Sequence, residues 1–242
     1  MRDLLITLAW CMIIIALLTF YALKTRVAEY GRHATNTAAS ISPKLGWFIQ
    51  EMPSYVIPMY FCLAGTSSTG LYLNFLMVCH YFVRSFIFPF RIRTITPSPL
   101  KIVIMAFFFC AYNGFLQGAW NAYYQPDEGF KWNHLIGFFV FIGGFIINQI
   151  SDNILFSLRD RFGKGYHIPE GFMFKYMSCP NYFGEIMEWT GYAIMAWNLP
   201  ATAFAIFTAA NLIPRAHSHH EWNLKNIRNY PKNRGALLPP MP

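Results

Sequence analysis

Five ionisable side chains lie inside or at the edge of long apolar stretches of this 242-residue chain. A charged group is costly to bury within a bilayer, so ionisable residues in such stretches mark candidate functional sites. The five residues are Glu51, Arg84, Asp152, Glu185 and Glu188.

The first of these carboxyl groups follows Gln50 in an otherwise apolar stretch. Since Glu51 has no cationic neighbour in the local sequence, burial would favour the protonated acid, which can donate a hydrogen bond. The alternative is a structural ion pair between Glu51 and Arg84 of the next stretch. The sequence leaves both interpretations open.

A tyrosine and an arginine three residues apart share one face of the next predicted helix. Tyr81 and Arg84 have this spacing, and His80 lies one step around the helix. Tyrosines that only anchor a helix at the membrane interface lie near the ends of apolar stretches. Tyr81 is central in its stretch, which favours a functional role.

Asparagine and acidic residues recur at helical spacing in two later stretches. Asn148 and Asp152 are four residues apart, and Asn181, Glu185 and Glu188 follow at spacings of four and three. Each set would form a polar ladder that either holds helices together by hydrogen bonds or binds a polar ligand.

The composition indicates the elements that must position these residues. A mean hydropathy of +0.31, with 55% hydrophobic and 12% charged residues, leaves too little polar surface for a soluble globule. We therefore expect an all-α, polytopic membrane protein, a seven-transmembrane-helix bundle formed by one domain over residues 1–242. The predicted runs are 4–23, 45–65, 70–90, 99–121, 134–157, 181–198 and 199–213.

Most Lys and Arg residues lie in the tail and in the connections after the first, third and fifth runs. By the positive-inside rule, the N-terminus is outside or lumenal and the C-terminus is cytoplasmic. The membrane would be the endoplasmic reticulum in a eukaryote or the inner membrane in a bacterium. Residues 215–228 are predicted as a short cytoplasmic helix, and the last two runs are either two helices or one broken helix.

Several other functions are not supported by the sequence. The net charge of +8 is dispersed over short loops, so we expect no nucleic-acid partner. The five cysteines lack ligand spacing, and the single tract of His217, His219 and His220 is a weak metal signal. Metal binding is therefore not expected. The sequence also shows no feature that would indicate an obligate protein partner.

Short motifs along nearly the whole chain also resemble, in order, those of one family. They are Tyr30-Gly31-Arg32-His33, Gln50-Glu51-x-Pro53-Ser54, His80-Tyr81-x-x-Arg84, Asn113-Gly114-x-x-Gln117, Ile147-Asn148-x-x-Ser151-Asp152, Gly165-Tyr166-x-Ile168-Pro169, Asn181-Tyr182-Phe183-Gly184-Glu185-Ile186-x-Glu188-Trp189, and His219-His220-Glu221-Trp222 with Tyr230-Pro231-Lys232. The set is similar to the steroid 5α-reductases, or 3-oxo-5α-steroid 4-dehydrogenases.

This resemblance implies a seven-helix bundle in which the cytoplasmic half binds NADPH. The membrane half would bind a 3-keto-4-ene steroid or a sterol-like lipid, and membrane lipids would surround the protein. Hydride would reach C5 and a proton would reach C4. Tyr81 and protonated Glu51 match the catalytic positions, where donors to the ketone oxygen stabilise negative charge in the transition state. Other family positions would border the nicotinamide or the steroid: Tyr30, Trp47, Gln50 and Arg84.

The resemblance also implies a set of cofactor-binding residues. They are Asn148, Asp152, Arg159, Tyr166, His167, Asn181, Glu185, Arg215, His219 and Asn223. Cationic groups suit phosphates, and carboxylates suit ribose hydroxyls. His167, Phe156 and Asn223 replace Arg, Arg and Tyr of many relatives, which leaves the preference for NADPH over NADH open.

Three other functions remain as alternatives at this point. The chain could reduce another sterol or lipid enone, or it could be a membrane methyltransferase of similar fold that uses S-adenosylmethionine. It could also be a non-catalytic transporter or lipid-binding protein whose buried acids form an ion path.

Overall fold

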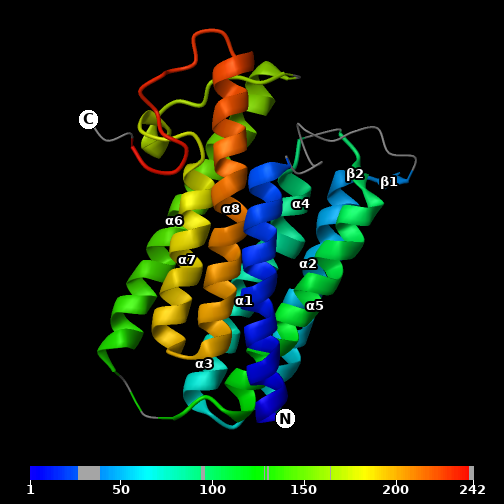
Figure 1. Ribbon diagram of the computed structural model, residues 1–242, viewed down its shortest axis with the longest axis vertical. Helices are drawn as coiled ribbons and strands as arrows, with labels where there is room; N and C mark the ends of the chain where they lie inside the picture. Colours follow the sequence, from blue (N-terminus) through cyan, green and yellow to red (C-terminus); the bar gives the residue numbers. More distant parts are fainter. Residues whose placement is uncertain (27–38, 94–95, 128, 130, 164, 240–242) are drawn as a thin grey trace. The chain divides into compact units, whose positions relative to one another are not determined.

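The computed structural model describes residues 1–26, 39–93, 96–127, 129, 131–163 and 165–239, and these residues are mostly helical, as predicted (Figure 1). Two short strands, β1 (Ser40–Ile41) and β2 (Ser98–Pro99), pair in antiparallel register. The helical elements are α1 (Arg2–Thr25), α2 (Pro43–Ala64), α3 (Ser68–Phe82), η2 (Val83–Ile87), α4 (Phe88–Arg91), α5 (Leu100–Tyr123), α6 (Trp132–Phe162), η3 (Phe172–Lys175), α7 (Pro180–Ala196) and α8 (Leu199–Asn226).

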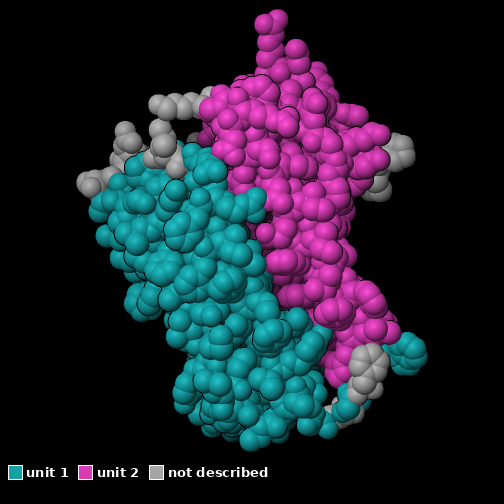
Figure 2. Space-filling view, turned by 180° about the vertical axis from the view of Figure 1, so that it is seen from behind, with its two compact units in different colours: residues 1–11, 28–132, 196–203 teal, residues 12–27, 133–195, 204–242 magenta. Residues whose placement is uncertain are grey.

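The chain forms two compact units (Figure 2). Unit 1 comprises residues 1–11, 28–132 and 196–203, and unit 2 comprises residues 12–27, 133–195 and 204–242. Helices α1 and α8 therefore each contribute residues to both units. Unit 1 contains Glu51 and Tyr81, whereas unit 2 contains the candidate cofactor residues.

In unit 1, helix α2 packs along α5 and also contacts α3. The α2 helix begins with Ser42, whose hydroxyl accepts a hydrogen bond from the backbone N–H of Leu45, and with Pro43 at the first helical position. Buried amides connect α3 to α5, because Asn121 donates to Asn74 (2.9 Å) and Asn74 donates to the Gly118 carbonyl (3.3 Å). These two hydrogen bonds hold the middle of α3 against the second half of α5.

The helix after Ser68 contains a π turn at Val83–Ile87, between α3 and α4. A π turn holds one residue more than the corresponding α turn and is often found at functional sites. The hydropathy pattern predicted an uninterrupted helix here. Arg84 lies in the π turn, one turn after Tyr81.

In unit 2, helices α6 and α7 approach so closely that four contact positions must be glycine, namely Gly137, Gly144, Gly184 and Gly191. A Cβ atom on Gly144 would lie 2.3 Å from the backbone nitrogen of Glu188, and one on Gly191 would lie 2.3 Å from that of Phe141. Small residues allow this backbone contact between membrane helices. Helix α8 packs on the same pair through Trp189 and Phe204, whose ring centroids are 4.5 Å apart.

The polar end of unit 2 is closed by a pairing of two distant segments. The backbone N–H groups of Ser178 and Cys179 donate to the carbonyls of Gly235 (2.9 Å) and Ala236 (3.0 Å). The N–H of Gly235 donates in turn to the carbonyl of Tyr176 (3.1 Å). The segment before α7 and the chain after α8 are thus held together.

Each predicted apolar run corresponds to a helix. Four helical stretches, Arg2–Thr25, Ser68–Arg91, Leu100–Tyr123 and Trp132–Phe162, are long and apolar enough to cross a membrane. The last two runs are two helices. Trp197 takes a positive φ of 46° between them, and the Asn198 side chain accepts from the N–H of Ala201 (2.8 Å) at the start of α8.

The prediction of a separate C-terminal helix over residues 215–228 was wrong. Helix α8 continues through Pro214 to Asn226. Proline removes only one backbone donor, and here the next turn is stabilised by packing, because Ala216 is buried in a cluster with Cys179 and Ala236. Tertiary contacts therefore carry the helix past a residue that normally ends one.

Candidate active site

A buried carboxyl group on α2 is the centre of the first polar cluster, which lies in unit 1. Glu51 is only 8% exposed. Its Oε1 atom accepts a hydrogen bond from Gln50 Nε2 (3.3 Å) and lies 3.8 Å from Nη2 of Arg84. The Cys110 thiol of α5 lies 4.0 Å from Oε2 and is oriented as a donor. The structure therefore forms the Glu51–Arg84 pair that the sequence left as an alternative.

The Arg84 guanidinium packs against two aromatic rings. Its Cζ atom is 4.6 Å from the centroid of Trp47 and 4.8 Å from that of Phe88. Such contacts stabilise a cation electrostatically, more strongly when water is excluded. The two rings are themselves 4.8 Å apart, so the indole of α2 and the phenyl group of α4 together position the cation beside Glu51.

Tyr81 lies in the last turn of α3, directly before the π turn that carries Arg84. Its side chain is 5% exposed, and its ring lies edge-on to that of His80 at 4.9 Å. Since α2 packs against both α3 and η2, neighbouring helices of one unit supply the carboxyl group, the cation and the phenol. A phenol and a carboxyl group are the kinds of donor that polarise a carbonyl group.

A second polar cluster joins α6 and α7 in unit 2. Asn148 donates to the backbone carbonyl of Asn181 (3.0 Å) and lies 3.5 Å from Oε2 of Glu185. Asn181 donates to Asp152 at 3.1 Å. The two predicted ladders thus face each other, and four of the predicted cofactor residues form one network.

Two further candidates on α8 have partners within unit 2. The hydroxyl of Tyr182 lies 3.3 Å from Nε2 of His219. Nη1 of Arg215 donates to the side chain of Asn211 one turn earlier (3.2 Å). These contacts place a histidine and a guanidinium on the part of α8 that follows its apolar half.

The other predicted cofactor residues have separate surroundings. The exposed ring of Tyr166 packs edge-on against Trp222 at 4.6 Å, and Asn223 next to that tryptophan is buried. His167 packs on Phe162 at 4.7 Å, and Arg159 is partly exposed in the last turn of α6. Tyr30 lies outside the described residues.

Two residues of the first cluster were not predicted. The four-residue spacing of Arg84 and Phe88 would have suggested their contact, because such residues share a helix face. Cys110 is 59 residues from Glu51, and no local pattern indicates that they meet. The same holds for the π turn, which places Arg84 in this cluster.

The comparisons with known proteins identify the family. Residues 96–241 match the family model described as 3-oxo-5-alpha-steroid 4-dehydrogenase. The chain is 37% identical over 250 residues to 3-oxo-5-alpha-steroid 4-dehydrogenase 1 of Bos taurus, covering 98% of this chain and 97% of that protein.

Relatives from other organisms give the same result. The chain is 37% identical to Steroid 5-alpha-reductase DET2 of Gossypium hirsutum, with 93% of each chain covered. It is 39% identical to 3-oxo-5-alpha-steroid 4-dehydrogenase 1 of Homo sapiens, covering 87% of this chain and 85% of that one. This chain therefore belongs to the 3-oxo-5α-steroid 4-dehydrogenase family of membrane oxidoreductases, which act on CH–CH groups.

Proposed function

We propose that this protein reduces the C4–C5 double bond of a 3-keto-4-ene steroid with NADPH as the cofactor. The observation that carries the proposal is the contact of the buried Glu51 with Arg84, with Tyr81 buried one helical turn before Arg84, in a chain of this family. A ketone at this group would meet a phenol and a carboxyl group, with a cation fixed beside them. That arrangement suits an enone, whose oxygen becomes negative as the ring is reduced.

The residues of unit 2 fit a phosphorylated dinucleotide by their chemistry. Asp152 and Glu185 supply carboxylates within an amide network, which suits ribose hydroxyls. Arg215 and His219 supply donors for phosphate oxygens. When bound, the reduced nicotinamide supplies the hydride that is added at C5.

Tyr81 and Glu51 would act on the other end of the enone. The phenol donates a hydrogen bond to the C3 oxygen. Glu51 would donate a second one in its protonated form, which the proposal requires in the substrate complex although Arg84 lies beside it. Both bonds strengthen as negative charge builds up on the oxygen. Arg84 lies 3.8 Å from Glu51, so its positive charge stabilises the same charge. Collapse of the enolate then takes a proton at C4 and gives the saturated 3-ketosteroid.

The direct test is turnover by the purified full-length protein in detergent with NADPH and androst-4-ene-3,17-dione. The expected result is loss of NADPH absorbance matched by the 5α-reduced product in mass spectrometry. A steroid recovered unchanged, together with products from other lipid enones, would reassign the substrate. If no enone in the panel is reduced, the proposal is wrong.

We further propose that all seven long helical segments cross the membrane, with a lumenal or outside N-terminus and a cytoplasmic C-terminus. The four apolar helices and the distribution of Lys and Arg support this topology. The polar network of α6 and α7 would then open toward the compartment that holds soluble cofactors.

A further inference from the structure

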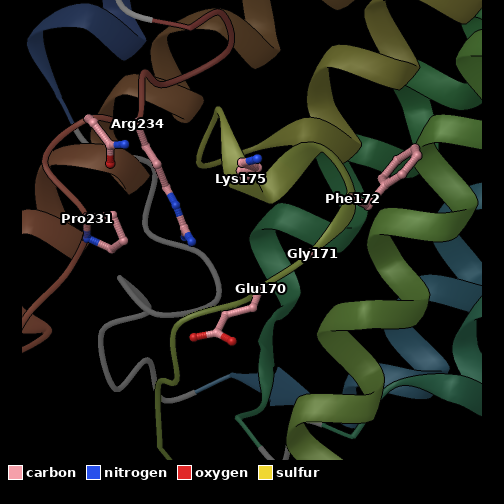
Figure 3. A pocket seen from close by; sticks show the side chains of 7 residues that line it. Glu170, Gly171, Phe172, Lys175, Pro231 and Arg234 are labelled. Carbon is pink, nitrogen blue, oxygen red and sulfur yellow. The ribbon is translucent and has the colours of Figure 1, made fainter.

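A hollow of about 340 Å³ lies at the polar end of unit 2, outside the residues assigned above (Figure 3). It lies between the segment that contains η3 and the chain after α8. Its lining residues are Glu170, Gly171, Phe172, Lys175, Pro231, Asn233 and Arg234.

Arg234 is the unusual member of this lining. It is only 6% exposed, and its Nε and Nη1 atoms have no hydrogen-bond partner among the described residues. Its guanidinium lies 5.3 Å from the ring centroid of Tyr230, which stabilises the cation but satisfies none of its N–H groups. Leaving such donors unsatisfied is costly, so a buried guanidinium in a hollow indicates an anionic ligand.

The position of Arg234 is fixed by its neighbours. The adjacent Gly235 exchanges backbone hydrogen bonds with Tyr176 and Ser178, at 3.1 and 2.9 Å. Tyr230, on which the guanidinium packs, donates its hydroxyl hydrogen to Ser178 (2.8 Å). The hollow is therefore preorganised, which reduces the entropic cost of binding a ligand.

The other polar side chains of the hollow define the ligand more closely. The exposed Lys175 adds a second cation, and Figure 3 shows Arg234 extending into the space between Pro231 and Lys175. Glu170 also lines the hollow, where its carboxylate repels a bare anion but accepts hydrogen bonds from hydroxyl groups. Arginine and lysine together suit a phosphate, and Glu170 suits a hydroxyl next to it.

We propose that this hollow binds a phosphate monoester that has a hydroxyl group on the adjacent carbon. Two molecules carry this chemistry: the 2′-phosphorylated ribose of NADPH, and the phosphorylated inositol headgroup of a membrane lipid. The first source rests on the function proposed above and would give this chain a means of preferring NADPH over NADH despite His167. The second source does not depend on that function.

The test is isothermal titration of the full-length protein in detergent with two soluble probes, 2′,5′-ADP and inositol 1,4-bisphosphate. Adenosine 5′-monophosphate serves as the reference because it lacks a phosphate beside a free ribose hydroxyl. We expect one of the two probes to bind, and Arg234→Gln and Lys175→Ala each to weaken it by about tenfold. The matched control is Lys232→Ala, an exposed lysine of the same loop that does not line the hollow.

The affected probe identifies the source. If the variants lose affinity only for 2′,5′-ADP, the ligand is the cofactor. If they lose affinity only for inositol 1,4-bisphosphate, the ligand is the lipid headgroup. Since Lys175 is exposed, its alanine variant stays informative even if Arg234→Gln does not fold. If a folded variant binds both probes as tightly as the parent protein does, the hollow is not a phosphate site and the proposal is wrong. Enone reduction is measured separately, so failure of either proposal is recognised without the other.

Discussion

At the scale of single residues, the environment of Glu51 is set by Arg84. Nη2 of the partly buried Arg84 lies 3.8 Å from Oε1 of Glu51. Arg84 is also held by the faces of Trp47 and Phe88. The guanidinium is thus positioned beside the carboxyl group by aromatic packing as well as by charge.

Replacing Tyr81 by phenylalanine removes one hydroxyl group and preserves the ring packing on His80. We expect kcat to fall by about 100-fold or more, because a donor to the developing oxyanion is lost. The affinity for NADPH, measured by titration calorimetry, should be unchanged. Tyr60→Phe, at an exposed position of α2, is the matched control. Full turnover in the Tyr81 variant would exclude the phenol from catalysis.

Glu51 and Arg84 should depend on each other in stability as well as in turnover. Glu51→Gln leaves the partly buried Arg84 cation without its acid, and Arg84→Gln leaves a buried acid without its cation, so each should lower the free energy of unfolding. The double variant should lose less than the sum, by a coupling on the order of 1 kcal/mol. Denaturant unfolding in mixed micelles measures this cycle. Strictly additive losses would mean that the pair is energetically silent.

His220 should make stability depend on pH. Burial, and then the nearby His217, lowers the pKa of His220, while Glu221 opposes the shift. Tyr230 donates to Ser178, which can then donate to Nδ1 of His220 (2.7 Å), a bond that requires the unprotonated nitrogen.

The sign follows from linkage. Because the unfolded chain has the higher histidine pKa, about 6.5, it binds protons first, so stability is retained above that pH and decreases as the pH falls below it. In melting temperatures recorded from pH 8 to 5, His220→Asn should show a smaller decrease than the parent. The control is the comparison of the two proteins at pH 8, because His220 is neutral at that pH in both the folded and the unfolded chain. Parallel curves would contradict the assignment.

At the scale of helices, the contact between α6 and α7 depends on the absence of side chains. We expect Gly144→Ala to destabilise the protein by about 1–3 kcal/mol, because the new methyl group would collide with the backbone of α7 at Glu188. Gly143→Ala is a stringent control, since its Cβ would meet only the flexible end of Met187 at 3.1 Å. Helix propensity favours alanine over glycine in both variants, so equal losses would show that the contact at Gly144 does not set the cost.

The sequence predicted helices well and their irregularities poorly. Apolar runs of about 20 residues report a local property, so each became a helix. The π turn at Val83–Ile87 and the passage of α8 through Pro214 depend on packing partners distant in the sequence. The same distinction applies to the sites: the Asn148 and Asn181 ladders followed from spacing, whereas Cys110 and the hollow at Arg234 did not.

At the scale of the whole molecule, the distribution of positive charge predicts the orientation in the membrane. The sequence contains no Asn-x-Ser/Thr site for N-glycosylation. An inserted site would therefore be the single possible source of a glycosylation signal. In endoplasmic-reticulum membranes, we expect glycosylation when it lies within residues 124–131 and none when it lies within 165–171. The reverse pattern would invert the proposed topology. The melting temperature of each insertion variant, compared with that of the parent, is the control for correct folding, because residues 165–171 include Tyr166 and His167 of the proposed cofactor site.

The π turn makes one stretch of its helix tolerant of a change in length. A π turn amounts to a single-residue insertion in an α-helix. Loss of one residue between Val83 and Ile87 would therefore let the turn close as a regular α turn, and the helix on either side, with Tyr81 and Phe88, would keep its direction. The wide turn that presents Arg84 to Glu51 would be lost, however. Such a deletion should leave a folded protein in which the cation no longer accompanies the acid.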